Sequence, residues 1–303
     1  MFYRWRTHCQ KAWFRIVTAG IWDTPPMPVV DAPWNIVTLS YKCDPCVIQM
    51  YLLAIKSFYS RLKRGRITLI VEHDFSPAVR RKLEHHLPGI GFANFEDIDL
   101  GACQSGGCWD TLMFALERSR EEYVIQLDSD TLTFGPDIGE VIHCAENNIP
   151  FTLSSWGDPI VPMLAAVKSA RERKSDYVGI AAERLFDRYP GAEHLKYVRA
   201  SGGFTGFARG GFARDEIENF HREGEKMLGA RWREWGTEQC ASNFAIANSP
   251  GSLVLPFPKY ANFPQGTVHD EGTFLHFFGT HRFKLGYYAA LARGVIAELR
   301  GGK

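Results

Sequence analysis

The amino-acid sequence predicts an α/β fold in which a mixed, mainly parallel sheet is flanked by helices. Between residues 35 and 127, short apolar runs alternate with longer segments whose apolar residues recur at helical spacing. The last of these runs ends abruptly in two aspartates. With 303 residues and 45% hydrophobic content, the chain is long enough for a single domain around one large sheet.

The first half of the chain contains four expected strands and three expected helices. The strands are short apolar runs, whereas each helix has apolar residues three or four positions apart. We expect strands at residues 35–40, 66–71, 94–100 and 123–127, and helices at 47–59, 77–87 and 109–120. In the second half, glycine and proline interrupt the pattern, which predicts long loops over a site rather than another regular βα array.

The first 33 residues differ in composition from the rest. Residues 1–20 carry only positive charge, interleaved with aromatic residues, and residues 24–33 hold four prolines, which is typical of an extended linker. We therefore expect a basic aromatic segment and a linker at residues 1–33 and the main domain at residues 34–303. The basic segment suits either a helix packed on the domain or contact with an anionic membrane surface.

Charge and hydropathy narrow the function classes. The formal net charge is +1, from 35 basic and 34 acidic side chains, so nothing favours nucleic acid as a partner. The chain has no apolar stretch of the roughly 18 residues that a membrane span needs. Basic residues interrupt the N-terminus where a signal peptide would be apolar. We expect a cytoplasmic protein, with any peripheral contact to the inner membrane surface made by the N-terminal segment.

The seven cysteines are an odd number without a secretory signal, which argues against a disulfide framework. Cys43 and Cys46 form one Cys-x-x-Cys pair, and Cys103 and Cys108 also follow an expected strand. These four thiolates could therefore meet around a zinc ion. The alternative is that they are buried or inert thiols.

Asp128 and Asp130 directly follow the apolar run at residues 123–127. Ligands of parallel α/β sheets bind at the carboxyl ends of the strands. The two carboxylates project the same way if the chain stays extended, and they can still converge if it turns. A pair of carboxylates at a strand end requires a positive charge, and a divalent cation with oxygen ligands fits. The alternative is a solvated turn whose aspartates cap backbone amides.

Four short motifs follow one another along the chain. They are YVIQLDSDTL, which contains Asp128, Ser129 and Asp130; ASGGFTGFARG, which contains Gly202 and Gly203; EQCASN, which begins at Glu238; and LPFPKYANF followed by His276-x-x-Gly279-x-x-Arg282. In this order they resemble the D-x-D, N-S-G, D-Q-x-x-L-N and H-x-x-G-x-x-K signatures of nucleotide-sugar glycosyltransferases of the GT-A fold. The resemblance is to the family 8 type, which includes glycogenin and lipopolysaccharide galactosyltransferases. This chain departs from the signatures at Glu238, Ser242 and Arg282, where the family has Asp, Leu and Lys.

The resemblance implies a GT-A fold and a metal-dependent, retaining transfer of a sugar from a nucleotide-diphosphate donor. We expect a UDP sugar as donor and a glycan, a lipid-linked sugar or a protein as acceptor. The metal ligands would be Asp128, Asp130 and His276, and the imidazole favours Mn²⁺ over Mg²⁺. Arg282 would bind a phosphate oxygen as a charged fork.

Further residues belong to the expected donor site. Glu238 and Gln239 would lie beside the anomeric carbon, where a carboxylate acts as nucleophile, as stabiliser or, in an inverting enzyme, as general base. The nucleotide and sugar would contact Tyr41, Lys42, Asp74, Ser129, Gly202, Gly203 and Gly279. Two simpler interpretations remain open: His276 could be packed among phenylalanines, and Glu238 could be a carboxylate at a helix N-terminus.

Two other functions remain open on the sequence. A phosphatase of the haloacid dehalogenase type also has D-x-D after a strand, with the first aspartate as nucleophile and the second as acid. That fold also requires a catalytic lysine and a later acidic metal motif, and Asp158 stands without a neighbouring acid. The second alternative is a non-catalytic module that binds a nucleotide or sugar on the same fold.

Overall fold

The computed structural model describes residues 2–40, 44–72, 74–106, 108–154, 156–264 and 272–301, with only the backbone described for residues 2–8, 39, 40 and 280. The chain forms two compact units. Unit 1 comprises Met1–Asp97, Leu127–Ile142 and Pro256–Lys303, and unit 2 comprises Ile98–Gln126 and His143–Leu255. Whether residues 1–33 form a separate segment before a single domain stays a prediction.

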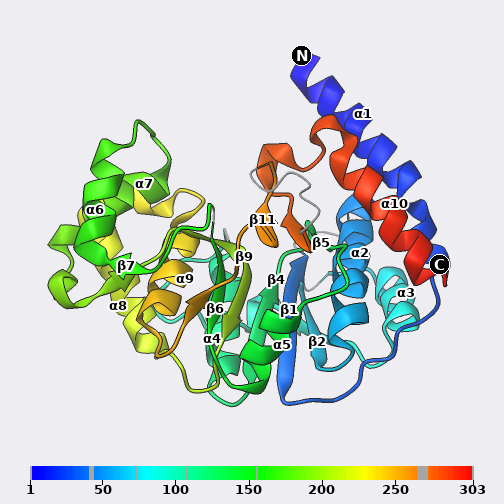
Figure 1. Ribbon diagram of the computed structural model, residues 1–303, viewed down its shortest axis with the longest axis horizontal. Coiled ribbons are helices and arrows are strands. Elements are labelled where there is room, and N and C mark those ends of the chain that lie inside the picture. Colours follow the sequence, from blue (N-terminus) through cyan, green and yellow to red (C-terminus); the bar gives the residue numbers. More distant parts are fainter. Residues whose placement is uncertain are drawn as a thin grey trace. The chain divides into compact units, whose positions relative to one another are not determined.

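Seven strands form one mixed, mostly parallel sheet, in the order β10-β6-β9-β4-β1-β2-β3 (Figure 1). Pairing is parallel for β1 with β2, for β2 with β3 and for β10 with β6, whereas β6 and β9 are antiparallel. The strands are β1 (Trp34–Ser40), β2 (Arg66–Val71), β3 (Gly91–Asn94), β4 (Tyr123–Leu127), β6 (Phe151–Ser154), β9 (Ala200–Phe207) and β10 (Leu253–Val254). The predicted α/β fold with a mainly parallel sheet flanked by helices is confirmed.

Unit 1 is organised around the long apolar helix α2 (Pro45–Leu62). The Asp44 side chain caps its N-terminus by accepting from the backbone N–H groups of Cys46 and Val47, and Lys63 ends it in the left-handed conformation. Helix α2 contacts β1, α1 and α10. The other helices of this unit are α1 (Phe2–Val17), α3 (Pro77–His86) and α10 (Tyr287–Leu299), while α5 (Gly139–Glu146) begins in it.

A second, three-stranded sheet in unit 1 has the order β11-β12-β5, where β5 is Thr131–Thr133, β11 is Tyr260–Asn262 and β12 is Phe274–His276. Strand β12 is parallel to β11 and antiparallel to β5. The Ser57 hydroxyl of α2 accepts from the Thr133 N–H at 3.2 Å, so this sheet is attached to the central helix. These short strands carry the polar side chains of the site described below.

Unit 2 holds a core of aromatic rings between its helices. Phe220 of α8 (Arg214–Leu228) and Phe244 of α9 (Thr237–Asn248) stack with their centroids 4.4 Å apart. Trp232 is fully buried beside them. The remaining elements of this unit are α4 (Trp109–Ser119), α6 (Met163–Glu172), α7 (Val178–Glu183), β7 (Val161–Pro162) and β8 (Lys196–Tyr197).

Two expectations about the elements are wrong. The strand expected at residues 94–100 lies earlier, at Gly91–Asn94, and a short 3₁₀ turn at Phe95–Asp97 follows it. Glycine, a weak strand former, obscured the true start, and the acidic stretch beyond it is not paired in the sheet. The second half of the chain is also more regular than expected, because α6 to α9 and the long β9 lie there. Glycines there lie inside elements as well as between them, as Gly202, Gly203 and Gly206 do in β9.

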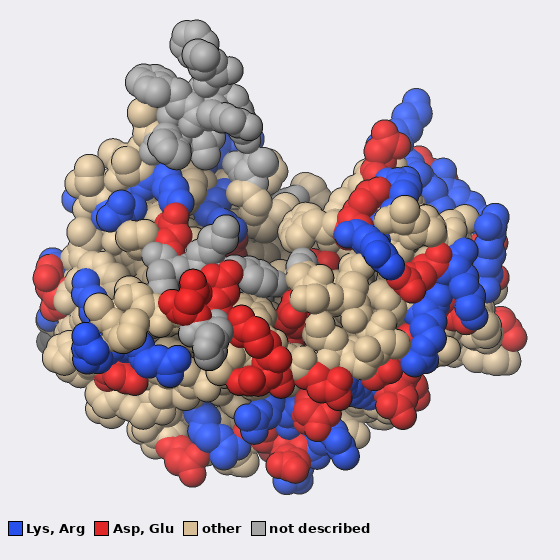
Figure 2. Space-filling view, turned by 180° about the vertical axis from the view of Figure 1, so that it is seen from behind, with Lys and Arg blue, Asp and Glu red and all other residues tan. Residues whose placement is uncertain are grey.

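The N-terminal segment forms helix α1, which lies alongside α10 (Figure 1). The proline-rich residues after it adopt no helix or strand, as expected, but they are anchored: the ammonium group of Lys56 donates to the Thr24 hydroxyl and to the Pro25 carbonyl, each at 2.7 Å. Among the described residues, no helix is long and apolar enough to cross a membrane. On the face shown in Figure 2, basic and acidic side chains are interspersed.

Candidate metal centre

The Asp128–Asp130 segment is a turn that joins β4 to β5. Both the backbone N–H and the hydroxyl of Thr131 donate to the carbonyl oxygen of Asp128, at 3.2 Å and 2.8 Å. The chain therefore bends here, which decides between the extended and the turned conformations considered from sequence. The Asp128 side chain is 28% exposed, whereas Asp130 is buried. Two carboxylates are thus held together at the end of a buried strand.

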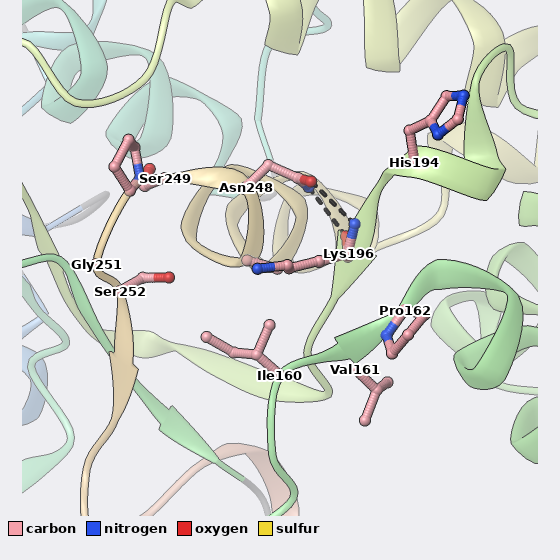
Figure 3. A pocket seen from close by; sticks show the side chains of 11 residues that line it. Ile160, Val161, Pro162, His194, Lys196, Asn248, Ser249, Gly251 and Ser252 are labelled. Carbon is pink, nitrogen blue, oxygen red and sulfur yellow. Dashed lines mark hydrogen bonds between the residues drawn. The ribbon is translucent and has the colours of Figure 1, made fainter.

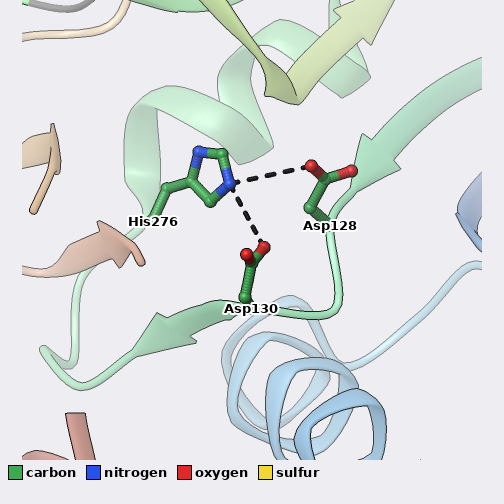
Figure 4. Close-up of side chains that lie close together, drawn as sticks. All are labelled: Asp128, Asp130 and His276. Carbon is green, nitrogen blue, oxygen red and sulfur yellow. Dashed lines mark ion pairs between the residues drawn. The ribbon is translucent and has the colours of Figure 1, made fainter. Parts of the chain in front are cut away.

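His276 reaches these carboxylates because β12 is antiparallel to β5, with His276 paired to Thr131. The N–H of Phe277 donates to the Asp130 carbonyl at 2.8 Å, which extends the pairing by one residue. The Nε2 atom of His276 lies 3.2 Å from Asp130 Oδ1 and 3.6 Å from Asp128 Oδ2. Figure 4 shows the imidazole pointing at both carboxylates. Residues about 150 positions apart in sequence therefore meet in one unit.

The other imidazole nitrogen of His276 faces Asn262. Asn262 lies directly across from His276 in the parallel β11–β12 pair, and its Oδ1 is 3.0 Å from Nδ1 of the histidine. With the amide oxygen as acceptor, Nδ1 donates to Asn262, and Nε2 faces the two aspartates, where it donates to Asp130 while the ring is protonated and can ligate a cation once that proton leaves. Both side chains are buried. Sequence reasoning did not find Asn262; its place inside the stretch LPFPKYANF was the available signal, but its role depends on strand register.

Arg282 completes the cluster. Its Nε atom donates to Asp130 Oδ2 at 2.9 Å, and its Nη2 atom also bonds to the same oxygen. The arginine follows the short 3₁₀ helix Gly279–His281, which begins at a glycine with φ of 57°. A glycine adopts that conformation without the strain that other residues carry. The chain therefore bends at Gly279, between His276 and Arg282, and this bend brings the guanidinium to Asp130.

The charges of the cluster depend on one another. Burial raises the pKa of Asp130, but the Arg282 guanidinium and the His276 ring outweigh it and hold that pKa below its ordinary value. Burial raises the pKa of Asp128 above the ordinary value, although His276 opposes it. Burial lowers the pKa of His276, but Asp130 and Asp128 together raise it above its usual range. The cluster therefore holds a charged carboxylate at Asp130, whose negative charge Arg282 and His276 offset.

A divalent cation fits this donor set. Among the described residues, Asp128, Asp130 and His276 form a group whose ligand atoms all lie within 4.8 Å of one another. Two carboxylate oxygens and one imidazole nitrogen suit Mn²⁺ better than an ion that binds only oxygen. Asn262 supplies the hydrogen bond that metal-ligating histidines usually make through their second nitrogen. Each of the three sequence-predicted ligands is part of this group.

The other predicted residues of unit 1 differ in placement. Ser129 is half-buried between the two aspartates, and Asp74 is exposed just after β2. Tyr41 and Lys42 lie outside the described residues. Cys43 lies outside them as well, while Cys46, Cys103 and Cys108 are thiols that are not joined in disulfides among the described residues. The possible zinc site at these four cysteines therefore gains no support from the described part of the chain.

Four predicted residues belong to unit 2. Gly202 and Gly203 lie in β9, where the Gly202 carbonyl accepts from the Gln126 side chain at 2.8 Å. Glu238 and Gln239 lie in the first turn of α9, and Glu238 Oε2 accepts from the Gly236 N–H at 2.9 Å. The helix N-terminal position considered for Glu238 is thus observed. A role at the anomeric carbon for Glu238 and Gln239 stays a prediction.

Unit 2 also contains two open cavities. One of about 780 Å³ is lined by Glu238 together with the exposed Trp235 and the loop around Gln104. The other, of about 490 Å³, lies where the end of α9 meets β7 and β8, and Asn248 there bonds to the backbone of Lys196 (Figure 3). The lining of the second cavity includes none of the predicted site residues.

Comparisons with known proteins return only structural similarity. No protein-family model matches the chain, and no curated protein matches it. Similar solved structures include the galactosyltransferase LgtC in complex with donor and acceptor sugar analogues, which is 12% identical with a TM-score of 0.47, over 85% of this chain and 95% of that chain.

Two further structures are also similar. Mouse xyloside xylosyltransferase 1 in its apo form is 11% identical, with a TM-score of 0.46 over 83% of this chain and 98% of that chain. The Mn/GDP form of core-mannan synthase A from Aspergillus fumigatus is 11% identical, with a TM-score of 0.43 over 90% of this chain and 86% of that chain. Any function for this chain must therefore rest on its own residues and their geometry.

Proposed function

We propose that the chain is a metal-dependent glycosyltransferase that moves a sugar, with retention, from a UDP sugar to a glycan, lipid-linked or protein acceptor. The observation that carries the proposal is the convergence of Asp128, Asp130 and His276, with Arg282 beside them. The order of the four sequence motifs supports the same reaction class. The donor nucleotide and the acceptor come from the sequence resemblance alone.

The residues of the cluster match what such a transfer requires. Departure of a nucleoside diphosphate leaves negative charge on the phosphates, and a bound Mn²⁺ would stabilise that charge as a Lewis acid. Asp128, Asp130 and His276 would hold the ion. Arg282 is permanently charged and presents a planar fork of donors, so it is suited to a phosphate oxygen once it leaves Asp130.

The phosphatase alternative fits the cluster less well. It requires the second carboxylate, Asp130, to deliver a proton to a leaving group. Asp130 instead accepts two bonds from Arg282, which stabilises its charged form. A carboxyl group with a lowered pKa is a poor general acid near neutral pH. The geometry therefore favours an electrostatic or metal-binding role for Asp130.

The test is a thermal unfolding series with UDP, GDP, CDP and ADP, each with and without Mn²⁺. A ligand that binds the folded state at about 100 times its Kd adds about 2.7 kcal/mol of stability. We expect the midpoint to rise when UDP and Mn²⁺ are present together. We expect no rise with UDP in the absence of Mn²⁺, and none with the other nucleotides. Turnover of UDP sugars, measured as UDP release, then tests transfer or donor hydrolysis directly.

Two variants make this test specific. Asp128→Asn removes one ligand charge and is expected to keep the fold, because the pKa of Asp128 is already raised and its neutral form is tolerated. It should lose the combined shift with UDP and Mn²⁺. Asp176→Asn changes an exposed carboxylate of unit 2 and should behave as wild type. Absence of any shift in the wild-type protein, or an unchanged shift in Asp128→Asn, would contradict the proposal.

A further inference from the structure

One side of helix α1 presents apolar side chains to solvent. Trp13 is 47% exposed and Ile16 is 75% exposed, and Cys9 and Ala12 are also exposed. These four positions follow the pattern i, i+3, i+4, i+7, so they share one side of the helix. In the sequence, the same spacing reaches back to a tryptophan at position 5 and a phenylalanine at position 2. We call this side, together with Leu285, the α1 surface.

The outward orientation of the α1 surface is fixed by the opposite side of the helix. Phe14 is buried, and its ring centroid lies 5.3 Å from that of Phe283 and 4.8 Å from that of Tyr288. The Gln49 side chain of α2 donates to the Arg15 carbonyl at 2.8 Å and to the Thr18 hydroxyl at 2.6 Å. The exposed apolar side chains therefore cannot turn into the core without breaking these contacts.

Leu285 extends the α1 surface from another part of the chain. It is 81% exposed and has φ of 57°, a left-handed conformation that is unfavourable for leucine. The next residue, Gly286, touches Trp13: a side chain there would come within 2.9 Å of the indole ring. Trp13 and the strained, exposed Leu285 are thus neighbours, although they lie about 270 positions apart in the sequence. Burial of the Leu285 side chain does not offset this strain, because the side chain lies in solvent.

Basic residues are interleaved with these apolar residues in the sequence. The first 22 residues contain no aspartate or glutamate, whereas arginine or lysine occurs at positions 4, 6, 11 and 15. Arg15 and Lys284 are exposed, and Lys11 forms an ion pair with Asp44 at 2.6 Å. A second copy of the chain would bring like charges together across a symmetric contact. A negatively charged surface with an apolar interior complements both the charge and the exposed rings.

We infer that the α1 surface docks the protein on the anionic headgroup layer of a membrane, with Trp13, Ile16 and Leu285 entering the interface. Amphipathic helices with basic and aromatic side chains lie in this layer, and each basic residue near it adds attraction to anionic lipid. The inference goes beyond the proposed reaction and is independent of it. Because Leu285 is three residues from Arg282, docking would place the candidate metal centre close to the lipid surface.

The test is co-sedimentation of the full chain with vesicles. One set is phosphatidylcholine alone, and in the other about one third of the lipid is phosphatidylglycerol. We expect binding to the anionic vesicles only, and weaker binding at high salt because exposed charges are screened. The double variant Arg15→Glu with Lys284→Glu should lose about tenfold or more of the partition coefficient. Trp13→Ala with Ile16→Ser should reduce the partition coefficient by a similar factor, because less apolar surface is buried in the membrane.

Two controls keep the result interpretable. Leu285→Gly removes an exposed side chain at a position where glycine relieves strain, so reduced binding of this variant cannot be attributed to unfolding. Trp156→Ala removes a tryptophan of unit 2 that is somewhat more exposed than Trp13, at 58%, and should bind as wild type. Nucleotide-induced stabilisation, measured on the same variants, reports on the proposed reaction separately.

Three outcomes would overturn the inference. The first is absence of binding to the anionic vesicles by the wild-type protein. The second is equal binding by wild type and the Arg15→Glu, Lys284→Glu variant. The third is a concentration-dependent dimer in sedimentation velocity that Trp13→Ala with Ile16→Ser abolishes, because the α1 surface would then bind a second copy of the chain.

Discussion

The Nδ1 atom of His276 lies 3.0 Å from Oδ1 of Asn262, at the point where β11 and β12 pair in register. The contact holds the Nδ1 side of the ring, and so keeps Nε2 facing Asp128 and Asp130, where it can ligate a cation once its proton leaves. Asn262 is thus a positioning residue for the candidate metal centre. Its described side-chain contact is with the histidine, so it acts on the two carboxylates through His276.

The first prediction concerns this contact. Asn262→Leu keeps the volume of the side chain but removes the acceptor, so His276 loses its fixed tautomer and orientation. The affinity for Mn²⁺, measured by titration calorimetry without nucleotide, should fall roughly 10- to 100-fold. Asn262→Asp restores an acceptor for the Nδ1 proton and should recover most of the affinity. Equal affinities of Asn262→Leu and the wild type would show that Asn262 only fills space.

The second prediction concerns Arg282, which neutralises Asp130 in the absence of a cation. Arg282→Gln leaves a buried carboxylate with His276 as its remaining positive partner, and the free energy of unfolding without metal should fall by on the order of 2 kcal/mol. Mn²⁺ can supply the missing charge. The stabilisation by Mn²⁺ should therefore be larger in Arg282→Gln than in wild type, as measured by urea unfolding.

Arg282→Lys separates charge from geometry in the same experiment. Lysine keeps the positive charge but cannot place two donors on one carboxylate oxygen. Its stability without metal should lie between those of wild type and Arg282→Gln. If Mn²⁺ stabilises all three proteins by the same amount, the guanidinium and the cation do not compete for Asp130, and the role assigned to Arg282 is wrong.

Much of the site was predictable because its signals are local in sequence. The apolar run before Asp128 forms a strand that ends there. In the structure His276 ends a strand, Gly279 begins a turn, and the guanidinium of Arg282 bonds to Asp130. The convergence of His276 on Asp128 could be expected only from the resemblance. It depends on β12 pairing with β5, which no property of either segment alone specifies.

Other features could not be predicted for the same reason. Asn262 gains its role from a one-residue register between two strands of three residues each. The Arg282–Asp130 ion pair depends on how the chain folds back after Gly279, whereas the sequence suggested a phosphate contact for that arginine. The strand at Gly91–Asn94 forms through pairing with β2, although its own residues favour a strand weakly.

The third prediction compares two positions that share a backbone conformation. Gly279 and Leu285 both have φ of 57°. Gly279→Ala puts a side chain on a strained backbone where nothing described lies within 4 Å to compensate, and should lower the free energy of unfolding by about 1 kcal/mol. Leu285→Gly should be neutral or stabilising by up to about 1 kcal/mol. Urea unfolding measures both; destabilisation by Leu285→Gly would mean that Leu285 packs in solution.

The fourth prediction is a dependence of stability on acid pH that arises at His86. The side chain is buried, and its Nδ1 atom lies 3.4 Å from the ammonium group of Lys56. Burial, with Lys56, His85 and Lys82 in support, lowers the pKa of His86 from 6.5 to about 4, and Asp23 opposes this only weakly. The neutral ring accepts from Lys56, whereas a protonated ring would set two cations against each other.

The sign follows from which state binds the proton first. In the unfolded chain His86 titrates near its ordinary pKa, so between pH 6.5 and 4 the unfolded state holds the additional proton. The stability that His86 contributes is complete above pH 6.5 and is lost as the pH falls toward 4. The loss approaches about 1.4 kcal/mol per pH unit within that window.

The variant His86→Gln tests this prediction, because glutamine can accept from Lys56 without titrating. As the pH is lowered from 6.5 to 4, the wild type should lose more free energy of unfolding than His86→Gln. Effects of carboxylate titration are common to both proteins and cancel in the difference. A difference that is flat with pH would mean that His86 has the same pKa in the folded and the unfolded chain, and that folding does not disfavour its protonated form.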